Sequence, residues 1–310
     1  MRLLKKAALR LARDERGNVA LITAVGMVAF LGFLALVADF GSVYLHKQKL
    51  NNALDAGALS GIQRVLFGEA DARATAEAYV RQNGETPTNV DVDVDEMIVD
   101  VDGQRQVDLT FAKVLGYDRA TVTSDVEARA GVTVAGQGFV PIAVPEQDFV
   151  YGQLYTLSQG AGDGSSGNYG FLDFTGSGGA SELEALIRYG YDGKLRVGQE
   201  VETETGVNTG PVRDAIRSRI YGDSSAYACT DYRTAASGCQ RILYLPVIDS
   251  LADLTGNDFV TIVGFAAFYL EGIEGGGGHQ EIVGRFIRTI MPGEMGEGRD
   301  FGLYSVKLTH

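Results

Sequence analysis

The most apolar part of the chain is a run of 20 residues, Val19 to Ala38, without a charged side chain. As an α-helix this run is about 30 Å long, the thickness of the hydrocarbon core of a bilayer. A buried helix of a soluble protein is the weaker interpretation, because such a helix seldom reaches this length without a polar face. The end of the run, Leu36-Val37-Ala38, lacks the paired small residues of a signal-peptidase site, which favours an uncleaved anchor over a secretory signal.

Helical character continues beyond the apolar run. We expect one helix from Asn18 to Phe67, about 73 Å long. Its distal half places small residues at Ala53, Gly57 and Gly61, where they would let another helix backbone approach closely. The alternative is that these residues reflect only the helix propensity of an alanine-rich segment.

The next segment predicts a short amphipathic helix, and the segment after it predicts strands. Glu69 to Gln82 has apolar residues on one side, and Asn83-Gly84 ends it. Beyond it, apolar and polar residues alternate with period two, as in half-buried antiparallel strands. The alternating positions are Val90, Val92 and Val94, then Val107, Leu109 and Phe111, and then Thr121 to Val134. Residues 68–134 are therefore predicted to form a helix-plus-sheet module.

The remainder of the chain is rich in glycine. Residues 131–310 hold 31 of the 41 glycines, which indicates many turns and short strands. Strands are expected at Arg241 to Val247, Phe259 to Leu270, Glu281 to Ile290 and Tyr304 to Leu308, and short helices at Ser181 to Tyr189 and Pro211 to Ile220. We predict an α+β fold in four parts: a basic segment (1–17), the long helix (18–67), the helix-plus-sheet module (68–134) and a mainly-β domain (135–310).

Charge predicts the orientation of the apolar helix. The segment before it carries Arg2, Lys5, Lys6, Arg10, Arg13 and Arg16 against Asp14 and Glu15, a net charge of +4. The positive-inside rule keeps such a segment in the cytoplasm. Because the whole chain carries −13, the remainder carries −17, which argues against nucleic acid as a partner and against anionic lipid bound by charge. We therefore expect a single-pass protein of the inner or plasma membrane, with its C-terminal domains outside the cytoplasm.

Two cysteines, Cys229 and Cys239, lie ten positions apart. In an oxidising compartment a disulfide between them is expected. Two free buried thiols are the alternative, whereas a metal site is disfavoured because no histidine or further cysteine lies nearby.

The sequence offers little catalytic chemistry. The histidines are His46, His279 and His310, and neither a zinc-protease H-E-x-x-H motif nor a G-x-S-x-G nucleophile turn occurs. We therefore expect no enzyme activity, no cofactor and no metal. The acidic run around Asp91, Asp93 and Asp95 does not meet the EF-hand pattern and is better explained as a solvated strand face.

One further carboxylate lies at the outer end of the apolar run. Asp39 is placed where it could be hydrated or could meet a basic partner, and the sequence favours neither.

Three blocks of the N-terminal region resemble a known family. They are Arg16-Gly17-Asn18-Val19 before the apolar run, Asp39-Phe40-Gly41 after it, and the stretch from Leu50 through Asp55 to Gly61. Together they are similar to the N-terminal module of TadG-like proteins of the Tad (Flp) pilus-assembly group, and the following module resembles the next part of such proteins. The resemblance implies a bitopic membrane protein of a pilus or secretion apparatus, with Asp39, Gly41 and Asp55 as motif residues. It implies other Tad components and the bilayer as partners, and allows a homo-oligomer.

Two departures from the family pattern limit what the resemblance implies. The chain has no D-x-S-x-S metal motif, so the metal-dependent adhesion of von Willebrand type A domains is not expected. Processed pilins of the same system are cut after a glycine and carry glutamate five residues later, but here Ile22 is the fifth residue after Gly17.

The leading hypothesis is a non-enzymatic, membrane-anchored structural or assembly component of a Tad-type pilus, with Ala53, Gly57 and Gly61 as its helix-packing surface. One alternative is a pilin-like subunit that is cut after Gly17 and polymerises through its N-terminal helix. Another is a surface adhesin or glycan-binding domain, residues 135–310, on a membrane anchor.

Overall fold

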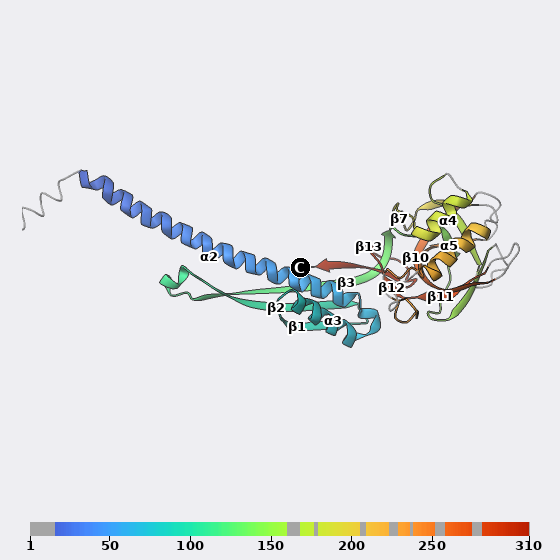
Figure 1. Ribbon diagram of the computed structural model, residues 1–310, viewed down its shortest axis with the longest axis horizontal. Coiled ribbons are helices and arrows are strands. Elements are labelled where there is room, and N and C mark those ends of the chain that lie inside the picture. The colour runs from blue at the N-terminus through green and yellow to red at the C-terminus, as the bar shows by residue number, and fades with distance from the viewer. Residues whose placement is uncertain are drawn as a thin grey trace, which may run out of the picture.

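The computed structural model describes residues 16–159, 168–176, 179–204, 209–222, 229–235, 238–251, 258–274 and 281–309. The molecule is elongated: one long helix leads into a sheet that lies alongside its second half, and a rounded unit follows at the far end (Figure 1). The predicted α+β class, with one long apolar helix at the N-terminus and a β-rich C-terminal part, is confirmed.

Helix α2 (Arg16–Ile62) passes from an exposed to a buried environment without a break. Apart from the half-buried Val43, the large apolar side chains between Val19 and Leu45 are 40–72% exposed, whereas Leu50, Leu54 and Ala58 are fully buried. An 18-residue window of this helix reaches a mean hydropathy of 2.5, and none of that window is buried inside the protein. The helix is therefore long and apolar enough to cross a membrane in its first half, while its second half belongs to a folded core.

The helix ends five residues before the predicted Phe67. A short 3₁₀ turn, η1 (Val65–Phe67), follows, and Gly68 then adopts a φ of +107°, which favours glycine. This reversal lets α3 (Glu69–Gln82), whose bounds are those predicted, return antiparallel along α2.

The first sheet covers the second half of α2. Its path is β1 (Pro87–Asp93), β2 (Ile98–Asp108), β3 (Arg119–Gly136), β14 (Leu303–Thr309) and β12 (Thr289–Ile290), while β13 (Gly293–Met295) and β7 (Leu195–Arg196) pair with the far end of β3. The first four strands pair antiparallel, in the register that places valines such as Val90, Val101 and Val126 in the core beneath the helices. We call α2 from Leu50 onward, α3 and this sheet the proximal module.

The C-terminal strand completes the proximal module. Strand β14 pairs with Glu127 to Val132 of β3, although about 170 residues separate the two strands in the chain. A division at residue 134 therefore does not separate the two sheets, because residues 289–309 return to the first one.

A second set of strands closes on itself. It contains β4 (Ile142–Pro145), β5 (Leu154–Gln159), β6 (Asn168–Asp173), β8 (Glu200–Glu204), β9 (Ile242–Ile248), β10 (Phe259–Glu274) and β11 (Glu281–Ile287). Strand β10 pairs with both β9 and β11, so the order β11-β5-β6-β4-β9-β10 forms a ring, and β8 joins β6 to β10. Helices α4 (Ala180–Tyr189) and α5 (Thr209–Tyr221) pack beside each other against the ring. We call these elements the distal ring.

Between Gly264 and Leu270 strand β10 is buried on both faces, which explains the unbroken apolar sequence there. One face contributes Ala266, Phe268 and Leu270 to the core that also holds α4 and α5, and the other contributes Phe265, Ala267 and Tyr269 to a second core beside the disulfide. The glycine run at 275–278 lies outside the described residues.

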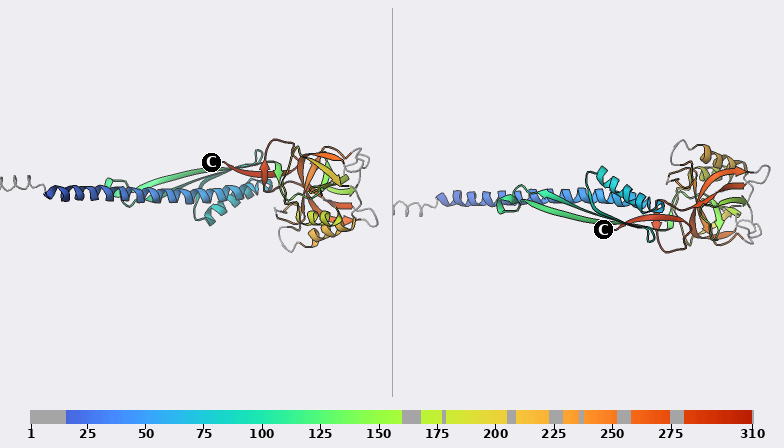
Figure 2. Two further views of the ribbon diagram at one scale, coloured as in Figure 1. Left: turned by 90° about the horizontal axis from the view of Figure 1, so that it is seen from above. Right: turned by 90° about the horizontal axis from the view of Figure 1, so that it is seen from below.

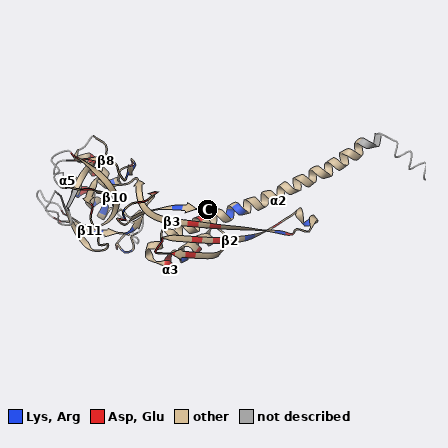
Figure 3. Cartoon of the chain, turned by 180° about the vertical axis from the view of Figure 1, so that it is seen from behind, with Lys and Arg blue, Asp and Glu red and all other residues tan. Residues whose placement is uncertain are grey.

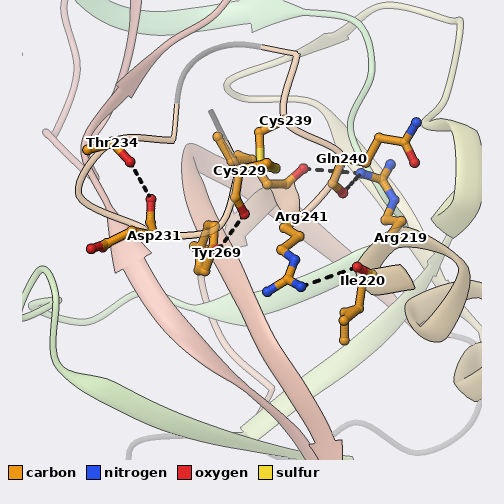
Figure 4. The surroundings of a disulfide bond; sticks show 10 residues. Arg219, Ile220, Cys229, Asp231, Thr234, Cys239, Gln240, Arg241 and Tyr269 are labelled. Atoms are coloured by element: carbon orange, nitrogen blue, oxygen red, sulfur yellow. Dashed lines mark hydrogen bonds between the residues drawn. A yellow bond between two sulfur atoms is a disulfide. The ribbon is translucent and has the colours of Figure 1, made fainter. Parts of the chain in front are cut away.

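A disulfide joins Cys229 and Cys239 beside the second core (Figure 4). The hydroxyl of Tyr269 on β10 donates to the carbonyl of Cys229 at 2.7 Å. The disulfide thus closes a loop within the connection between α5 and β9, and the hydrogen bond of Tyr269 ties this connection to β10.

Arg219 of α5 fixes a neighbouring part of the distal ring (Figure 4). Its guanidinium is buried and donates to the carbonyl oxygens of Ile187, Gln240 and Ile242, at 2.5, 3.0 and 3.1 Å. Burial lowers the pKa of Arg219 to about 10, so the side chain stays protonated at neutral pH. One charged residue therefore ties the ends of α4 and β9 to α5.

Candidate functional site

The best-defined polar contacts of the chain lie where α2 leaves its apolar run. Asp39, Lys47 and Asn51 are spaced by eight and four residues, which places them on one side of the helix. This side faces the β2–β3 hairpin, which runs alongside α2 toward the apolar half (Figures 1 and 2).

Asp39 is 6% exposed and binds the tip of that hairpin. Its carboxylate accepts hydrogen bonds from the backbone N–H groups of Thr110, Phe111 and Ala112 at 2.8, 2.9 and 2.7 Å. These residues open the 3₁₀ turn η2 (Ala112–Leu115), which has no side-chain cap of its own. Asp39 therefore caps the N-terminus of η2 although it belongs to helix α2. In most helices this role falls to the N-cap residue directly before the first turn. The hydrogen bonds of this carboxylate thus come from backbone amides of the hairpin tip.

Two further contacts continue this attachment away from the apolar run. The ammonium group of Lys47 donates to the carbonyl of Thr123, and the hydroxyl of Ser124 donates to Asn51 at 2.7 Å. On the neighbouring strand, a Cβ at Gly103 would lie 2.9 Å from methyl groups of Leu50 and Leu54, so β2 approaches α2 so closely that a larger residue here would displace these leucine side chains. The hairpin is thus bound to the helix along its length.

Beyond Asp39 the hairpin tip lies beside the apolar run itself. An apolar cleft of about 380 Å³ separates the two elements. The helix contributes Ala29, Gly32, Phe33 and Leu36 to its lining, and the tip contributes Val114 and Leu115 among others.

Gly57 and Gly61, two of the three residues predicted to form a helix-packing surface, contact α3 of the same chain. A Cβ at Gly57 would lie 2.4 Å from Cγ2 of Val80 and 3.0 Å from the carbonyl oxygen of Ala76, and a Cβ at Gly61 would lie 2.9 Å from Cβ of Ala76. Ala53, on the same helix, is 1% exposed. This surface is filled within the chain, so a second subunit cannot pack on it without displacing α3.

The three motif residues do not converge on one site. Gly41 is exposed, and a Cβ added there would meet no atom within 4 Å, so sterics do not require glycine at this position. Asp55 is half-buried on α2, sixteen residues beyond Asp39 and therefore about 24 Å along the helix. Of the three, Asp39 is the one that contacts the hairpin tip.

The acidic residues of β1 and β2 alternate with buried valines and therefore lie on the face of the first sheet that is turned away from α2. Figure 3 shows how they follow one another along these strands. Asp91, Asp100 and Glu127 are direct neighbours across β1, β2 and β3. Burial, together with the charges of Glu127, Asp102 and Asp91, raises the pKa of Asp100. Within the described ranges no group of three or more His, Cys, Asp or Glu side chains could hold a metal ion. His46 lies in the described part of the chain, whereas His279 and His310 lie outside it.

Sequence reasoning missed the hairpin tip. The alternating pattern predicts a strand only as far as Phe111 and assigns no role to the connection that follows. A signal is present, because residues 111–117 read FAKVLGY and hold one charge, whereas turns between half-buried strands are usually polar.

Comparison with known proteins agrees with the resemblance seen in the sequence. Residues 17–76 match the family model Tad, described as "Putative Flp pilus-assembly TadE/G-like". No curated protein and no solved structure matches the chain. The matched segment covers α2, with its apolar run and Asp39, and the first half of α3. Residues 17–76 are therefore similar to the TadE/G-like Tad family of Flp pilus assembly, and the helix within this segment is a candidate membrane span.

Proposed function

We propose that this protein is a non-enzymatic structural component of a Tad-type pilus, anchored by a single membrane span. Its N-terminus lies in the cytoplasm, and the proximal module and distal ring lie outside. Other components of the pilus or secretion apparatus are its partners.

The continuity of α2 is the observation that carries this proposal. The same helix is exposed and apolar between Val19 and Ala38 and is the buried centre of the proximal module from Leu50 onward. Three of its polar side chains, Asp39, Lys47 and Asn51, are bound to the hairpin between these two parts. Such a helix transmits position and force from the membrane to the outer units, which suits a scaffold better than a catalyst.

Charge supports the proposed orientation. The segment before the span carries net +4 and the remainder −17, and the positive-inside rule favours the basic side in the cytoplasm. The disulfide between Cys229 and Cys239 fits an oxidising compartment outside it.

Two exposed tyrosines on the distal ring support contact with partner proteins. Tyr189 and Tyr221, the last residues of α4 and α5, are 78% and 81% exposed. Exposed tyrosines are enriched at protein interfaces, so we place pilus contacts on this face of the distal ring.

A proline in the exposed part of α2 tests the proposal. Gly41→Pro removes a helical hydrogen bond and kinks the helix between the span and the module. In a deletion strain that expresses the variant, we expect pili to be lost while the protein remains in the membrane fraction. Gly41→Ala is the matched control and should restore pili, because nothing lies within 4 Å of this position. Wild-type pili with Gly41→Pro would contradict the proposed role of a continuous helix.

One observation favours the pilin-like alternative. The large apolar side chains of the first half of α2 are exposed and begin two residues after Gly17, as in a subunit that packs its helix inside a filament. Mass spectrometry of the mature protein separates the two functions: Met1 or its processed neighbour at the N-terminus supports the anchor, and Asn18 supports the filament subunit.

A further inference from the structure

The tip of the β2–β3 hairpin is unusually apolar for an exposed turn. Phe111, Val114, Leu115 and Tyr117 are 47%, 89%, 70% and 67% exposed. Lys113 is the one charged residue between Leu109 and Tyr117. A soluble protein would lose free energy by presenting four large apolar side chains to water at one turn.

The tip lies at the depth of the membrane span. It shares an apolar cleft with Ala29, Gly32 and Phe33 of α2. Ala29 is nine residues before Ala38, the last residue of the apolar run, and therefore about 14 Å further into the bilayer. If the run crosses the membrane, the tip cannot remain in bulk water unless the bilayer is displaced around it.

Most backbone N–H groups of the tip are hydrogen-bonded within the protein. Seven N–H groups between Leu109 and Tyr117 have acceptors within the protein, and backbone groups in lipid must be satisfied in this way. Three of the acceptor contacts come from Asp39, and the others are the carbonyls of Asp118, Phe111, Lys113 and Ala112. Gly116 closes the turn with a φ of +88°, in the left-handed region that favours glycine.

Charged and amphipathic residues lie at the boundary of the apolar tip. Asp108 and Arg119 form an exposed ion pair at 2.9 Å on the two strands just behind it. Lys113 has a long side chain that can carry its ammonium group toward the lipid headgroups while its methylenes stay among apolar atoms. Tyr117 has the amphipathic ring that is enriched at membrane interfaces. This order of residues is typical of a segment that enters one leaflet and does not cross the bilayer.

The apolar composition of the tip is not shared by the turn at the other end of strand β2. The β1–β2 turn contains Asp93, Asp95 and Glu96 and lies at the membrane-distal end of the same strand. The Asp93 carboxylate accepts the backbone N–H groups of Asp95 and Glu96 at 2.9 Å, as in an ordinary solvated turn. One strand thus carries an acidic turn at its outer end and an apolar turn at the membrane.

From these observations we infer that the β2–β3 tip inserts into the outer leaflet of the bilayer and forms a second membrane contact beside the span. Lipid acyl chains occupy the cleft between the tip and α2, because this cleft is continuous with the lipid-facing surface of the helix. Two contacts fix the rotation of α2 about its axis, which a single span leaves free. Asp39 holds the two contacts together. The inference rests on the membrane span of the proposed function.

The absence of tryptophan from the chain allows a direct test. Three full-length variants each receive one tryptophan: Leu115→Trp in the tip, Phe33→Trp in the span and Tyr189→Trp on the distal ring. Each is reconstituted at low protein-to-lipid ratio into nanodiscs of phosphatidylcholine and phosphatidylglycerol. Quenching by doxyl-labelled lipid acyl chains is compared with quenching by aqueous iodide, and circular dichroism checks that each variant is folded.

We expect the Leu115→Trp emission to be shifted to the blue and quenched by doxyl lipid to an extent similar to Phe33→Trp, with little quenching by iodide. Tyr189→Trp should show the reverse. Iodide quenching of Leu115→Trp at the level of Tyr189→Trp, with Phe33→Trp still quenched by lipid, would overturn the inference and leave the anchor intact. Protection of Leu115→Trp from both quenchers would show that protein covers the tip, and would also overturn it. A span tryptophan that lipid does not quench would contradict the proposed function itself.

Discussion

The proximal module and the distal ring are stabilised in different ways. The proximal module has an open sheet covered by two helices, whose close approach depends on Gly57, Gly61 and Gly103. The distal ring has closed strand pairing, a disulfide and a buried arginine. The first depends on the shapes of small residues, and the second on a closed set of strand pairings, one disulfide and the hydrogen bonds of one buried side chain. We therefore expect each unit to respond to its own set of substitutions, with β14 and the continuation of β3 as the connections between them.

The largest effect should follow from the loss of Arg219. Arg219→Met leaves the carbonyls of Ile187, Gln240 and Ile242 without their buried donor, and we expect about 4 kcal/mol of lost stability in the distal ring. Arg217→Met, on the exposed side of the same helix, is the matched control and should be close to neutral. Hydrogen exchange with mass spectrometry should show deprotection in the distal ring and not in α3; equal deprotection of both units would refute their independence.

Opening the disulfide should have the next largest effect. Cys229 and Cys239 close a loop of ten residues, for which chain entropy predicts about 3 kcal/mol of stabilisation. The double variant Cys229→Ser/Cys239→Ser should lower the denaturant midpoint of the distal ring, measured by pulse proteolysis of the full chain in nanodiscs. If the midpoint stays the same, the crosslink is not what stabilises that unit.

Gly57→Leu should damage the proximal module instead. The new side chain meets Val80 and the carbonyl of Ala76, and overpacking of this kind costs about 2 kcal/mol after the gain in helix propensity is subtracted. Gly41→Leu on the same helix meets no neighbour and serves as the control. We expect faster amide hydrogen exchange in α3 for Gly57→Leu and not for Gly41→Leu. Equal exchange in the two variants would contradict the packing of α3 on Gly57.

A local effect is expected for Asp39→Asn. The amide retains one acceptor oxygen but places an NH₂ group where the carboxylate faced N–H donors of Thr110, Phe111 and Ala112. Exchange should become faster in residues 109–117 and remain unchanged in the rest of the sheet. Unchanged protection of the tip would show that Asp39 is not its main attachment.

The smallest effect has the opposite sign. Asp100→Asn removes a charge that lies directly between Asp91 and Glu127, and we expect a gain of about 0.5 kcal/mol at neutral pH. Because burial and these charges raise the pKa of Asp100 in the folded state, protonation favours folding. The gain should therefore be full above the folded pKa and vanish as pH falls below the ordinary carboxyl value of about 4. A gain that persists at low pH would point to a cause other than charge.

The apolar run and most of the proximal module could be predicted because their residues carry local signals. The apolar run, the bounds of α3 and the alternating strands all follow from the spacing of apolar residues. The small residues Gly57 and Gly61 predict that another helix packs closely against α2. The sequence does not indicate that this helix is α3 of the same chain. The role of Asp39 could not be predicted, since backbone amides in a distant turn leave no trace in composition.

The distal ring was predictable only strand by strand. Strand β10 begins at the predicted Phe259, and α4 ends at the predicted Tyr189 but begins at Ala180, one residue before the predicted Ser181. The closure of the ring and the return of β14 to β3 are pairings between distant segments. Alternation specifies which face of a strand is buried, but not which strand lies beside it.

The orientation of the chain is the central claim, and site-directed labelling tests it most directly. The native cysteines form a disulfide and should not react with maleimide. Single cysteines are introduced at Lys5 and at Tyr189, and spheroplasts are treated with a membrane-impermeant maleimide before and after lysis. The account predicts labelling of Tyr189→Cys in intact spheroplasts and of Lys5→Cys only after lysis. Labelling of Lys5→Cys from outside, with Tyr189→Cys protected, would contradict it.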